Sequence, residues 1–205
     1  LGFNSDDDIS VQNGLLATMT SSDDITWTGT FTPTDDIEDT SNILQLATSY
    51  TDSAGNSGPT AQTANYSIDT KEPTISGLSI ASNNSNNTLA KEYEEVTLII
   101  TTNEDISTPS VTFTSGSASI NDSSITYAGS GTSWTAKYTV HSSDTDGAVA
   151  VSVTVTDLSG NQTTSTNITS GSVSVDTTSP TISALSIASN NSNNTLAKVG
   201  DLVIL

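Results

Sequence analysis

Apolar and polar residues alternate with a period of two through much of the chain, which is the pattern of half-buried β-strands. The pattern is clearest between residues 70 and 176, and no segment shows a convincing helical period. Seven short strands are expected there, built around Ile75, Leu78 and Ile80; Val96, Leu98 and Ile100; Val111 and Phe113; Ile125 and Tyr127; Trp134, Ala136, Tyr138 and Val140; Val149, Val151, Val153 and Val155; and Val173 and Val175. Seven strands joined by polar turns predict an all-β fold, an antiparallel β-sandwich.

The chain also repeats itself with a period of domain size. Residues 73–91 (PTISGLSIASNNSNNTLAK) recur at 180–198 as PTISALSIASNNSNNTLAK, with 18 of 19 positions identical after a shift of 107 residues. Trp27 and Trp134 are separated by the same 107 residues. A repeat of this length indicates tandem copies of one sandwich.

The repeat divides the chain into three parts. We expect a unit at residues 1–69 that lacks its first strands, a complete unit at 70–176, and the opening strands of a third repeat at 177–205. Two explanations of the incomplete ends remain open. The chain is expected to be an internal segment of a longer array; alternatively, one subunit donates strands that complete its neighbour.

Composition and charge exclude several classes of function. The 205 residues include four Lys, no Arg, one His and no Cys, against 23 Asp and Glu, for a formal net charge of -19. Four cations are too few to neutralise the phosphates of a nucleic acid or to form a basic membrane-binding patch. Without Cys the chain has no disulfide, no thiol nucleophile and no zinc-thiolate site, and it contains no apolar run long enough to insert into a membrane.

Catalysis is not expected either, because a hydrolytic triad needs a base and His141, the only histidine, lies beside an acidic turn. The acidic pairs at 23–24 and 35–36 lack a surrounding aromatic cleft, so they are poor candidates for a glycosidase site. Trp27 and Trp134 are expected to pack in the core rather than to stack on sugars.

Four strings of sequence resemble the immunoglobulin-like repeats of giant bacterial and archaeal surface proteins, including adhesins of the biofilm-associated and repeats-in-toxin types. The strings are VTVTDLSGN (153–161), VDTTSPTIS (175–183), FNSDDDISVQNG (3–14) and WTGTFTPT (27–34). The resemblance covers essentially the whole chain. It implies an extracellular array of immunoglobulin-like sandwiches at the cell surface, often stiffened by calcium.

Acidic side chains are expected to meet where the chain enters the complete unit. In an immunoglobulin-like sandwich the loop after the second strand and the loop after the sixth lie at this pole. The first loop carries Glu104 and Asp105, the second carries Asp157 and Asn161, and the linker carries Asp69. Carboxylates about 5 Å apart repel by roughly 3 kcal/mol per pair at an effective dielectric constant of about 20. Clustering them without Lys or Arg therefore calls for a cation.

Ligands that are all oxygen atoms favour calcium over zinc and, less strongly, over magnesium. The expected metal ligands are Asp69, Glu104 and Asp157, with Asp105 and Asn161 as further candidates, and with Asp176, near Asp144 and Asp146, as their counterpart at the next junction. The alternative is that these residues only form turns, because Asp and Asn favour turns for reasons of backbone geometry. Both interpretations stay open at this point.

The expected function is that of an extracellular spacer or stalk in a large repeat adhesin or surface protein, with calcium stiffening the domain junctions. Its partners would be neighbouring repeats of the same chain. One alternative is a subunit of a self-assembling surface filament or lattice, in which identical subunits associate through open end strands. A further alternative is a glycan-binding module, which would need an exposed aromatic platform.

Overall fold

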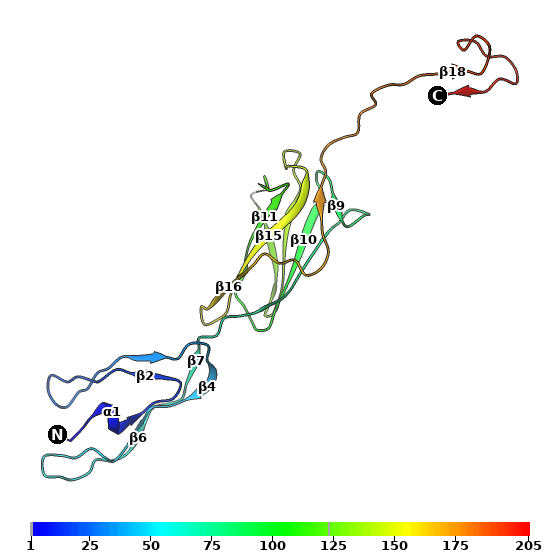
Figure 1. The fold of residues 1–205 in the computed structure, drawn as a ribbon. Helices are drawn as coiled ribbons and strands as arrows, with labels where there is room; N and C mark the ends of the chain where they lie inside the picture. Colours follow the sequence, from blue (N-terminus) through cyan, green and yellow to red (C-terminus); the bar gives the residue numbers. More distant parts are fainter. Residues whose placement is uncertain (1, 123) are drawn as a thin grey trace.

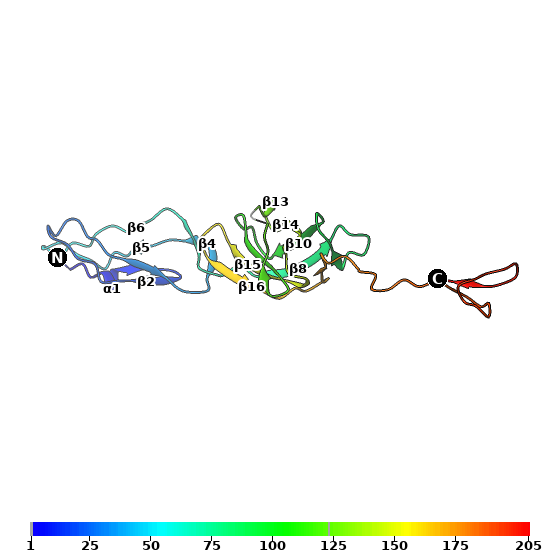
Figure 2. The same ribbon diagram turned by 90° about the horizontal axis from the view of Figure 1, so that it is seen from above.

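The computed structural model describes residues 2–122 and 124–205, which form three parts joined end to end (Figure 1). We call residues 2–69 the first unit, 70–176 the central unit and 177–205 the terminal segment. The parts follow one another along one elongated line, and the first unit and the terminal segment lie on opposite sides of the central unit (Figure 2). Among the described residues, no helix has the length and apolar character needed to cross a membrane.

The central unit is a sandwich of two sheets, in which every strand pair described is antiparallel except β9-β17. One sheet has the strand order β13-β14-β10-β8, and the other has the order β12-β11-β15-β17-β9, with β16 also paired to β15. The strands are β8 (Ile75–Ser82), β9 (Leu89–Ala90), β10 (Glu95–Thr102), β11 (Ser110–Ser115), β12 (Ala118–Ser119), β13 (Thr126–Ser130), β14 (Ser133–Thr139), β15 (Gly147–Thr156), β16 (Gln162–Ser165) and β17 (Ser174–Val175). The prediction of an all-β immunoglobulin-like sandwich is confirmed. The seven expected strands are all present, and β9, β12 and β16 are short additions.

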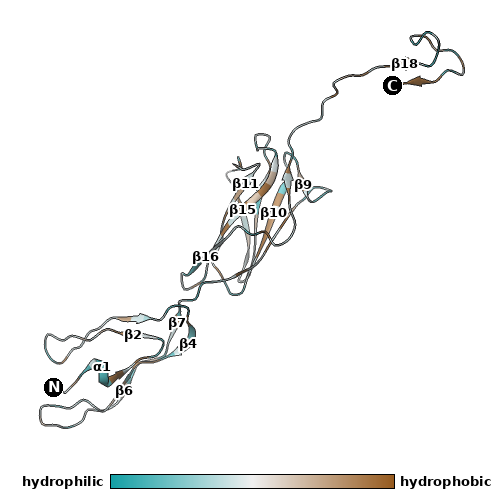
Figure 3. Ribbon diagram, in the orientation of Figure 1, coloured by the Kyte–Doolittle hydropathy of each residue, from teal (hydrophilic) through white to brown (hydrophobic). Residues whose placement is uncertain are grey.

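The core of the central unit lies between the two sheets and consists mainly of small β-branched side chains. In β10, residues 96, 98 and 100 point inward and are fully buried, and every second residue of β15 from Val149 to Val155 is buried as well. Figure 3 shows these apolar positions concentrated on the strands of the sandwich. Phe113 and Tyr138 supply the largest buried rings, with centroids 4.8 Å apart. The two-residue period of the sequence therefore corresponds directly to burial.

The first unit contains counterparts of only some of these strands. Its elements are α1 (Ser5–Asp8), β1 (Ile9–Ser10), β2 (Gly14–Leu16), β3 (Phe31–Pro33), β4 (Glu38–Asn42), β5 (Gln45–Leu46), β6 (Ala61–Gln62) and β7 (Tyr66–Asp69). The pair β2-β3 corresponds to β13-β14, and the pair β1-β5 corresponds to β11-β15. No described strand of this unit corresponds to β8 or β10, and Ile68, which is 5% exposed, is the only hydrophobic residue described in it that is buried.

One element of the first unit departs from the sequence prediction. Residues SDDD form a single helical turn, α1. The sequence, which shows no helical period, does not predict this turn. Asn4 caps this turn, because its side-chain oxygen accepts a hydrogen bond from the backbone amide of Asp6 at 3.1 Å. Local capping is sufficient for one turn, and a hydrophobic period is needed only for longer helices.

The terminal segment forms a short hairpin of β18 (Ala188–Ser189) and β19 (Val203–Ile204). Its loop, residues 190–195, has the same sequence as the loop at 83–88 and makes equivalent hydrogen bonds. Thr88 Oγ1 donates to Asn86 Oδ1 at 2.8 Å, and Thr195 Oγ1 donates to Asn193 Oδ1 at 2.7 Å. The preceding residues 182–187 form no strand, although residues 75–80, which differ from them only at Gly77, do so in β8 by pairing with β10.

The burial pattern of β10 generates a prediction about stability. Replacing Leu98, which is 0% exposed, in Leu98→Ala should lower the free energy of unfolding of the central unit by about 2–5 kcal/mol, because it leaves a cavity between the sheets. The matched variant Ile99→Ala changes the neighbouring residue, which is 45% exposed on the other face, and should cost about 1 kcal/mol or less. Urea unfolding followed by Trp134 fluorescence in a Trp27→Phe background measures both. Equal losses would contradict the assigned faces.

Candidate metal centre at the junction of two units

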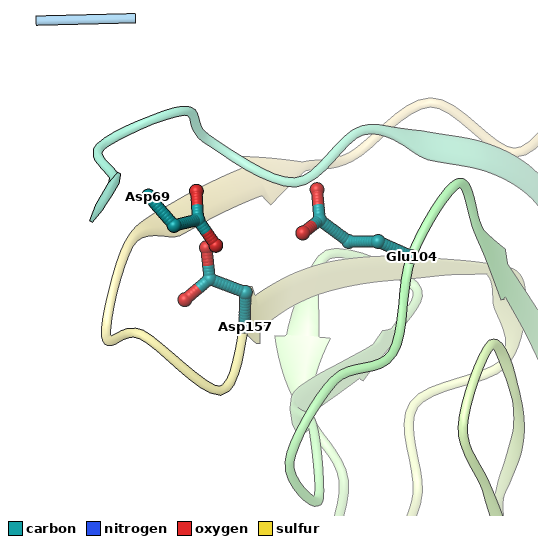
Figure 4. A group of neighbouring side chains, drawn as sticks. All are labelled: Asp69, Glu104 and Asp157. Carbon is teal, nitrogen blue, oxygen red and sulfur yellow. The ribbon is translucent and has the colours of Figure 1, made fainter. Parts of the chain in front are cut away.

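Three carboxylates from three separate segments meet where the first unit joins the central unit. Asp69 is the last residue of β7, Glu104 lies in the loop between β10 and β11, and Asp157 begins the loop between β15 and β16. Each offers an oxygen atom that lies within 4.8 Å of the other two, and the side chains point toward one another (Figure 4). Asp157 is buried, whereas Asp69 and Glu104 are half-buried. The sequence prediction that these three residues converge agrees with this geometry.

The position of Asp157 is fixed by a tight turn over residues 157–161. Its Oδ1 accepts hydrogen bonds from the backbone amides of Ser159, Gly160 and Asn161 at 2.8, 2.6 and 2.9 Å. Its Oδ2 accepts one from Asn161 Nδ2 at 2.8 Å. Gly160 has a φ of +103°, a backbone conformation that residues with a Cβ rarely adopt. The Asp-X-X-Gly-Asn string is therefore a turn motif that also orients a carboxylate.

The same turn recurs in the first unit at residues 52–56. Asp52 Oδ1 accepts hydrogen bonds from the amides of Ala54 and Asn56 at 2.8 and 2.9 Å, and Asp52 Oδ2 accepts one from Asn56 Nδ2 at 2.9 Å. Gly55 has a φ of +85°. Repetition of the motif thus produces the same local geometry in both units.

Backbone contacts to the linker hold Glu104 at the junction. The amide of Asn103 donates to the carbonyl of Thr74 at 3.1 Å, which ties the loop to the entering chain. Thr102 Oγ1 donates to the Glu104 carbonyl at 2.7 Å, and Asn103 Nδ2 donates to Glu104 Oε1 at 3.2 Å. These bonds direct the Glu104 side chain toward the linker.

The surroundings of Glu104 oppose its ionisation. Partial burial is the main cause that raises the pKa of this carboxyl; the Asn103 amide lowers it by less, and the negative charges of Asp69, Asp157 and Glu38 each add a smaller increase. Lys71 is the cation next to the cluster in sequence, and its Nζ lies 3.5 Å from Glu38 Oε2. Neither of the two ion pairs found in the described part of the chain includes Asp69, Glu104 or Asp157.

The pKa of Asp157 is shifted in the opposite direction, downward. Burial by itself raises the pKa of its carboxyl, but the hydrogen bonds from Asn161, Gly160 and Ser159 outweigh burial and hold the pKa below its ordinary value of 3.8. Asp157 is therefore charged at neutral pH. The cluster combines one carboxylate that is fixed in its ionised form with another whose ionisation its neighbours oppose.

Of the remaining predicted ligands, Asn161 lies at this cluster and Asp105 lies outside it. Asn161 is at the junction, but it directs its amide nitrogen there, donating to the Asp69 carbonyl at 3.2 Å and to Asp157. Asp105 is exposed and is not among the clustered carboxylates; its Oδ1 lies near Gly131 instead. The Asp105 side chain points away because the next residue, Ile106, enters the core and fixes the alternation of the loop.

Asp176 lies at the exit of the central unit, as the repeat predicts. It is exposed, and its Oδ1 accepts a hydrogen bond from the amide of Thr178 at 3.1 Å. Asp146 accepts hydrogen bonds there from the Thr177 amide at 2.7 Å and from the Thr177 and Thr178 hydroxyl groups. The linker at this exit is thus bonded to the loop between β14 and β15.

Sequence reasoning missed two residues that organise the first junction. Ser159 Oγ donates to Asp69 Oδ2 at 2.8 Å, and the Lys71 side chain bridges the linker to Glu38 of the first unit. The position of Ser159 inside the Asp-X-X-Gly-Asn string could have suggested its contact. The ion pair of Lys71 follows from the β4-β7 ladder, in which Glu38 lies opposite Asp69, two residues before Lys71.

Comparison with known proteins supports an immunoglobulin-like assignment for the first unit. Residues 2–68 match the family described as bacterial Ig-like domain. Domains of this family are typically structural modules without catalytic activity and are often exposed at the cell surface. No curated protein and no solved structure matches the chain. The first unit is therefore similar to bacterial Ig-like domains, and the internal repeat relates the central unit to it.

The turn at residues 157–161 can be tested without any metal. In the presence of chelator, Asp157→Ala should lower the free energy of unfolding of the central unit by about 1–3 kcal/mol, because three partly buried backbone hydrogen bonds and one from the Asn161 side chain lose their acceptor. Asp157→Asn keeps one side-chain oxygen for those amides and should lose less. Thermal or urea unfolding measures both variants. If Asp157→Ala unfolded like the unchanged chain, the turn would not be what fixes this side chain.

The equivalent turn in the first unit should show a pH effect. The hydrogen bonds that Asp52 accepts from the Asn56 side chain and amide lower the pKa of its carboxyl below 3.8. A lowered pKa in the folded state means that the ionised form stabilises the turn above about pH 4, and that this contribution is lost as the pH falls through the lower folded value. A ¹³C NMR titration of the Asp52 carboxyl should give a midpoint below 3.8. A midpoint at or above that value would contradict the bonding.

Proposed function

We propose that this chain is an extracellular spacer segment of a larger repeat surface protein of the adhesin type, in which calcium at the junctions fixes one sandwich relative to the next. The observation that carries the proposal is the meeting of Asp69, Glu104 and Asp157, one from the linker and two from loops of the central unit. A ligand that joins these segments would restrict the hinge between the units.

The chemistry of the cluster suits calcium. Three carboxylates offer hard oxygen ligands, and carbonyl groups of the loops and linker lie beside them. Calcium accepts six to eight such ligands in flexible geometry, so it tolerates an arrangement assembled from three loops. The carboxylates also have a reason to bind a cation, because positive charge would offset the negative charges of Asp69 and Asp157, which add to the effect of burial in raising the pKa of Glu104.

The junction is already partly fixed by the protein itself. Five residues separate the end of β7 at Asp69 from the start of β8 at Ile75, and Pro73 in this linker is fully buried. Asn161 and Ser159 bond to Asp69 from the central unit, and Lys71 pairs with Glu38 of the first unit. A cation would add to these contacts by holding the two loops of the central unit to the last residue of the first.

The expected effect is on stiffness more than on folding. At a calcium concentration ten times the dissociation constant, binding at one site adds only about 1.4 kcal/mol to the stability of the folded state. A surface location agrees with the acidic composition, since salt outside the cell screens repulsion between exposed charges beyond about 8 Å. A stalk that keeps a distant functional domain away from the cell surface needs such stiffness along its length.

Calorimetric titration with calcium tests the site directly. The unchanged chain and Asp105→Asn should bind calcium with the same affinity, because Asp105 is exposed outside the cluster. Glu104→Gln should weaken binding about tenfold or more, because it removes one of three charged ligands. The two variants lose the same formal charge from the same loop, so the comparison separates a specific site from general attraction to an acidic chain.

Small-angle X-ray scattering with and without chelator tests the mechanical part of the proposal. Removing calcium should broaden the distribution of distances between the units, and Glu104→Gln should show the broad distribution in both conditions. If the two variants bound calcium with equal affinity, or if the scattering did not change with calcium, the proposal would be wrong. These residues would then be turn formers and not metal ligands.

A further inference from the structure

The three-residue motif Asn-X-Ser/Thr, which marks acceptors for N-linked sugars, occurs eight times in the chain. The eight asparagines are Asn65, Asn83, Asn86, Asn121, Asn161, Asn167, Asn190 and Asn193. A chain rich in Asn, Ser and Thr produces this motif by composition, so the number of motifs carries no argument. A sugar acceptor must also present a free side-chain nitrogen next to the hydroxyl of the third residue, in an exposed segment. The structure separates the eight motifs on these requirements.

Three of the eight asparagines already use their side-chain nitrogens. The Nδ2 atoms of Asn65, Asn121 and Asn161 donate to backbone carbonyls at 2.8, 3.0 and 3.2 Å. A sugar on one of these nitrogens would displace the hydrogen bond. For Asn161 the lost bond would be the one to the Asp69 carbonyl at the first junction. These three positions are therefore poor acceptors in the folded chain.

In three further motifs the hydroxyl of the third residue is directed elsewhere. In the motif of Asn167, the Thr169 hydroxyl donates to the carbonyl of Leu78 in β8 and accepts from its amide, both at 3.0 Å. In the motifs of Asn83 and Asn190, the serine hydroxyl donates to the side chain of the middle residue at 3.4 and 3.3 Å. None of these hydroxyl groups bonds to the side chain of its own acceptor asparagine.

Asn86 and Asn193 meet all the requirements. The amide and the hydroxyl of Thr88 donate to Asn86 Oδ1 at 3.3 and 2.8 Å, and those of Thr195 donate to Asn193 Oδ1 at 3.2 and 2.7 Å. Because a backbone amide only donates, the atom that faces it is the side-chain oxygen, and the side-chain nitrogen points away. Both asparagines are exposed, and neither nitrogen has a hydrogen-bond partner among the residues that the structure describes.

The loop that carries Asn86 lies at the pole where the chain leaves the central unit. It joins β8 to β9, and the Thr88 carbonyl accepts a hydrogen bond from the amide of Ser174 in β17 at 2.9 Å. In Figure 1, β9 lies at the end of the central unit opposite β16. The loop contains none of the three clustered carboxylates, so a sugar on it leaves the first junction unobstructed.

We propose that Asn86 and Asn193 are acceptors for N-linked sugars, at the same position of two repeats. The donor is a sugar diphosphate, either a nucleotide sugar or a lipid-linked sugar. The Asn nitrogen forms a bond to the anomeric carbon of the sugar while the bond from that carbon to the diphosphate oxygen breaks. The diphosphate leaves with the electron pair, and one proton of the nitrogen passes to a base of the transferase. The attached sugar extends into solvent beside the strand that leads to the next repeat.

Mass spectrometry of tryptic peptides from the chain made in its own cells tests the assignment. Trypsin cleaves after Lys, and the four Lys residues separate peptide 72–91, which carries the motifs of Asn83 and Asn86, from peptides 1–71 and 92–137. Peptide 72–91 should gain the mass of a sugar on Asn86, and the other two should keep their unmodified masses. A single hexose would identify a nucleotide sugar as donor, and a chain of several sugars a lipid-linked donor.

Two results of this measurement would overturn the proposal. The first is the absence of sugar from Asn86 and Asn193, including the case in which sugar is found on Ser or Thr instead. The second is equal modification of Asn65 or Asn161, which would show that the motif alone, without the loop geometry, decides where sugar is attached. Calcium binding at the first junction is measured separately, so either proposal can fail while the other stands.

Variants of the loop at residues 83–88, made in the same cells, test the roles of its atoms. Asn86→Asp keeps the oxygen that accepts from Thr88 but removes the nitrogen, so the loop should keep its shape and peptide 72–91 should lose its sugar. Thr88→Ala should also lose the sugar, and Thr88→Ser should retain it. The matched control Asn87→Gln changes the exposed middle residue and should be modified like the unchanged chain. Retention of the sugar in Asn86→Asp would overturn the assignment.

Discussion

Burial of small apolar side chains between two facing sheets is the interaction on which this structure depends. Val, Ile and Ala side chains each contribute little apolar area, so the core is stable only when both sheets are complete enough to exclude water. The central unit meets this condition, with residues such as Leu98 and Val153 fully buried. Among the described residues of the first unit, Ile68 is the one buried hydrophobic residue, and no described strand of that unit corresponds to β8 or β10. The comparison shows how far the burial of these small side chains depends on having both sheets in place.

The sandwich architecture also explains why acidic side chains meet at the junction. Strands that run between the two poles of a sandwich return their loops to the entering linker, and those loops bring Glu104 and Asp157 next to Asp69. Turn formation alone accounts for the position of Asp157, since its oxygens accept four hydrogen bonds. It does not account for the proximity of Asp69 and Glu104, whose charges oppose each other across a seam without a pairing lysine. The proposal of a bound cation rests on this difference.

Much of this organisation could be predicted from sequence because it depends on period and repetition. Alternation identified the strands of the central unit, and the strand order of an immunoglobulin-like sandwich placed Asp69 and Asp157 at one pole. The direction of individual loop side chains could not be predicted in this way. Asp105 points away from the cluster and Asn161 presents its nitrogen, because the neighbouring backbone, not residue type, sets those directions. The pairing of Lys71 with Glu38 depends on the register of β4 and β7, which the alternation of apolar and polar residues does not reveal.

The loops at residues 83–88 and 190–195 have a consequence for the order of folding. Both keep the same bonds between Asn and Thr side chains, one inside a finished sandwich and the other in a hairpin that has almost no sheet around it. In both copies the loop also bonds to the start of the following strand, through Asn84 to Glu94 at 2.7 Å and through Asn191 to Asp201 at 2.8 Å, so its geometry is encoded within one hairpin. During synthesis, each new repeat can shape this loop as soon as it leaves the ribosome, before its later strands exist. Local structure that forms first shortens the search for the correct strand partner among nearly identical neighbours.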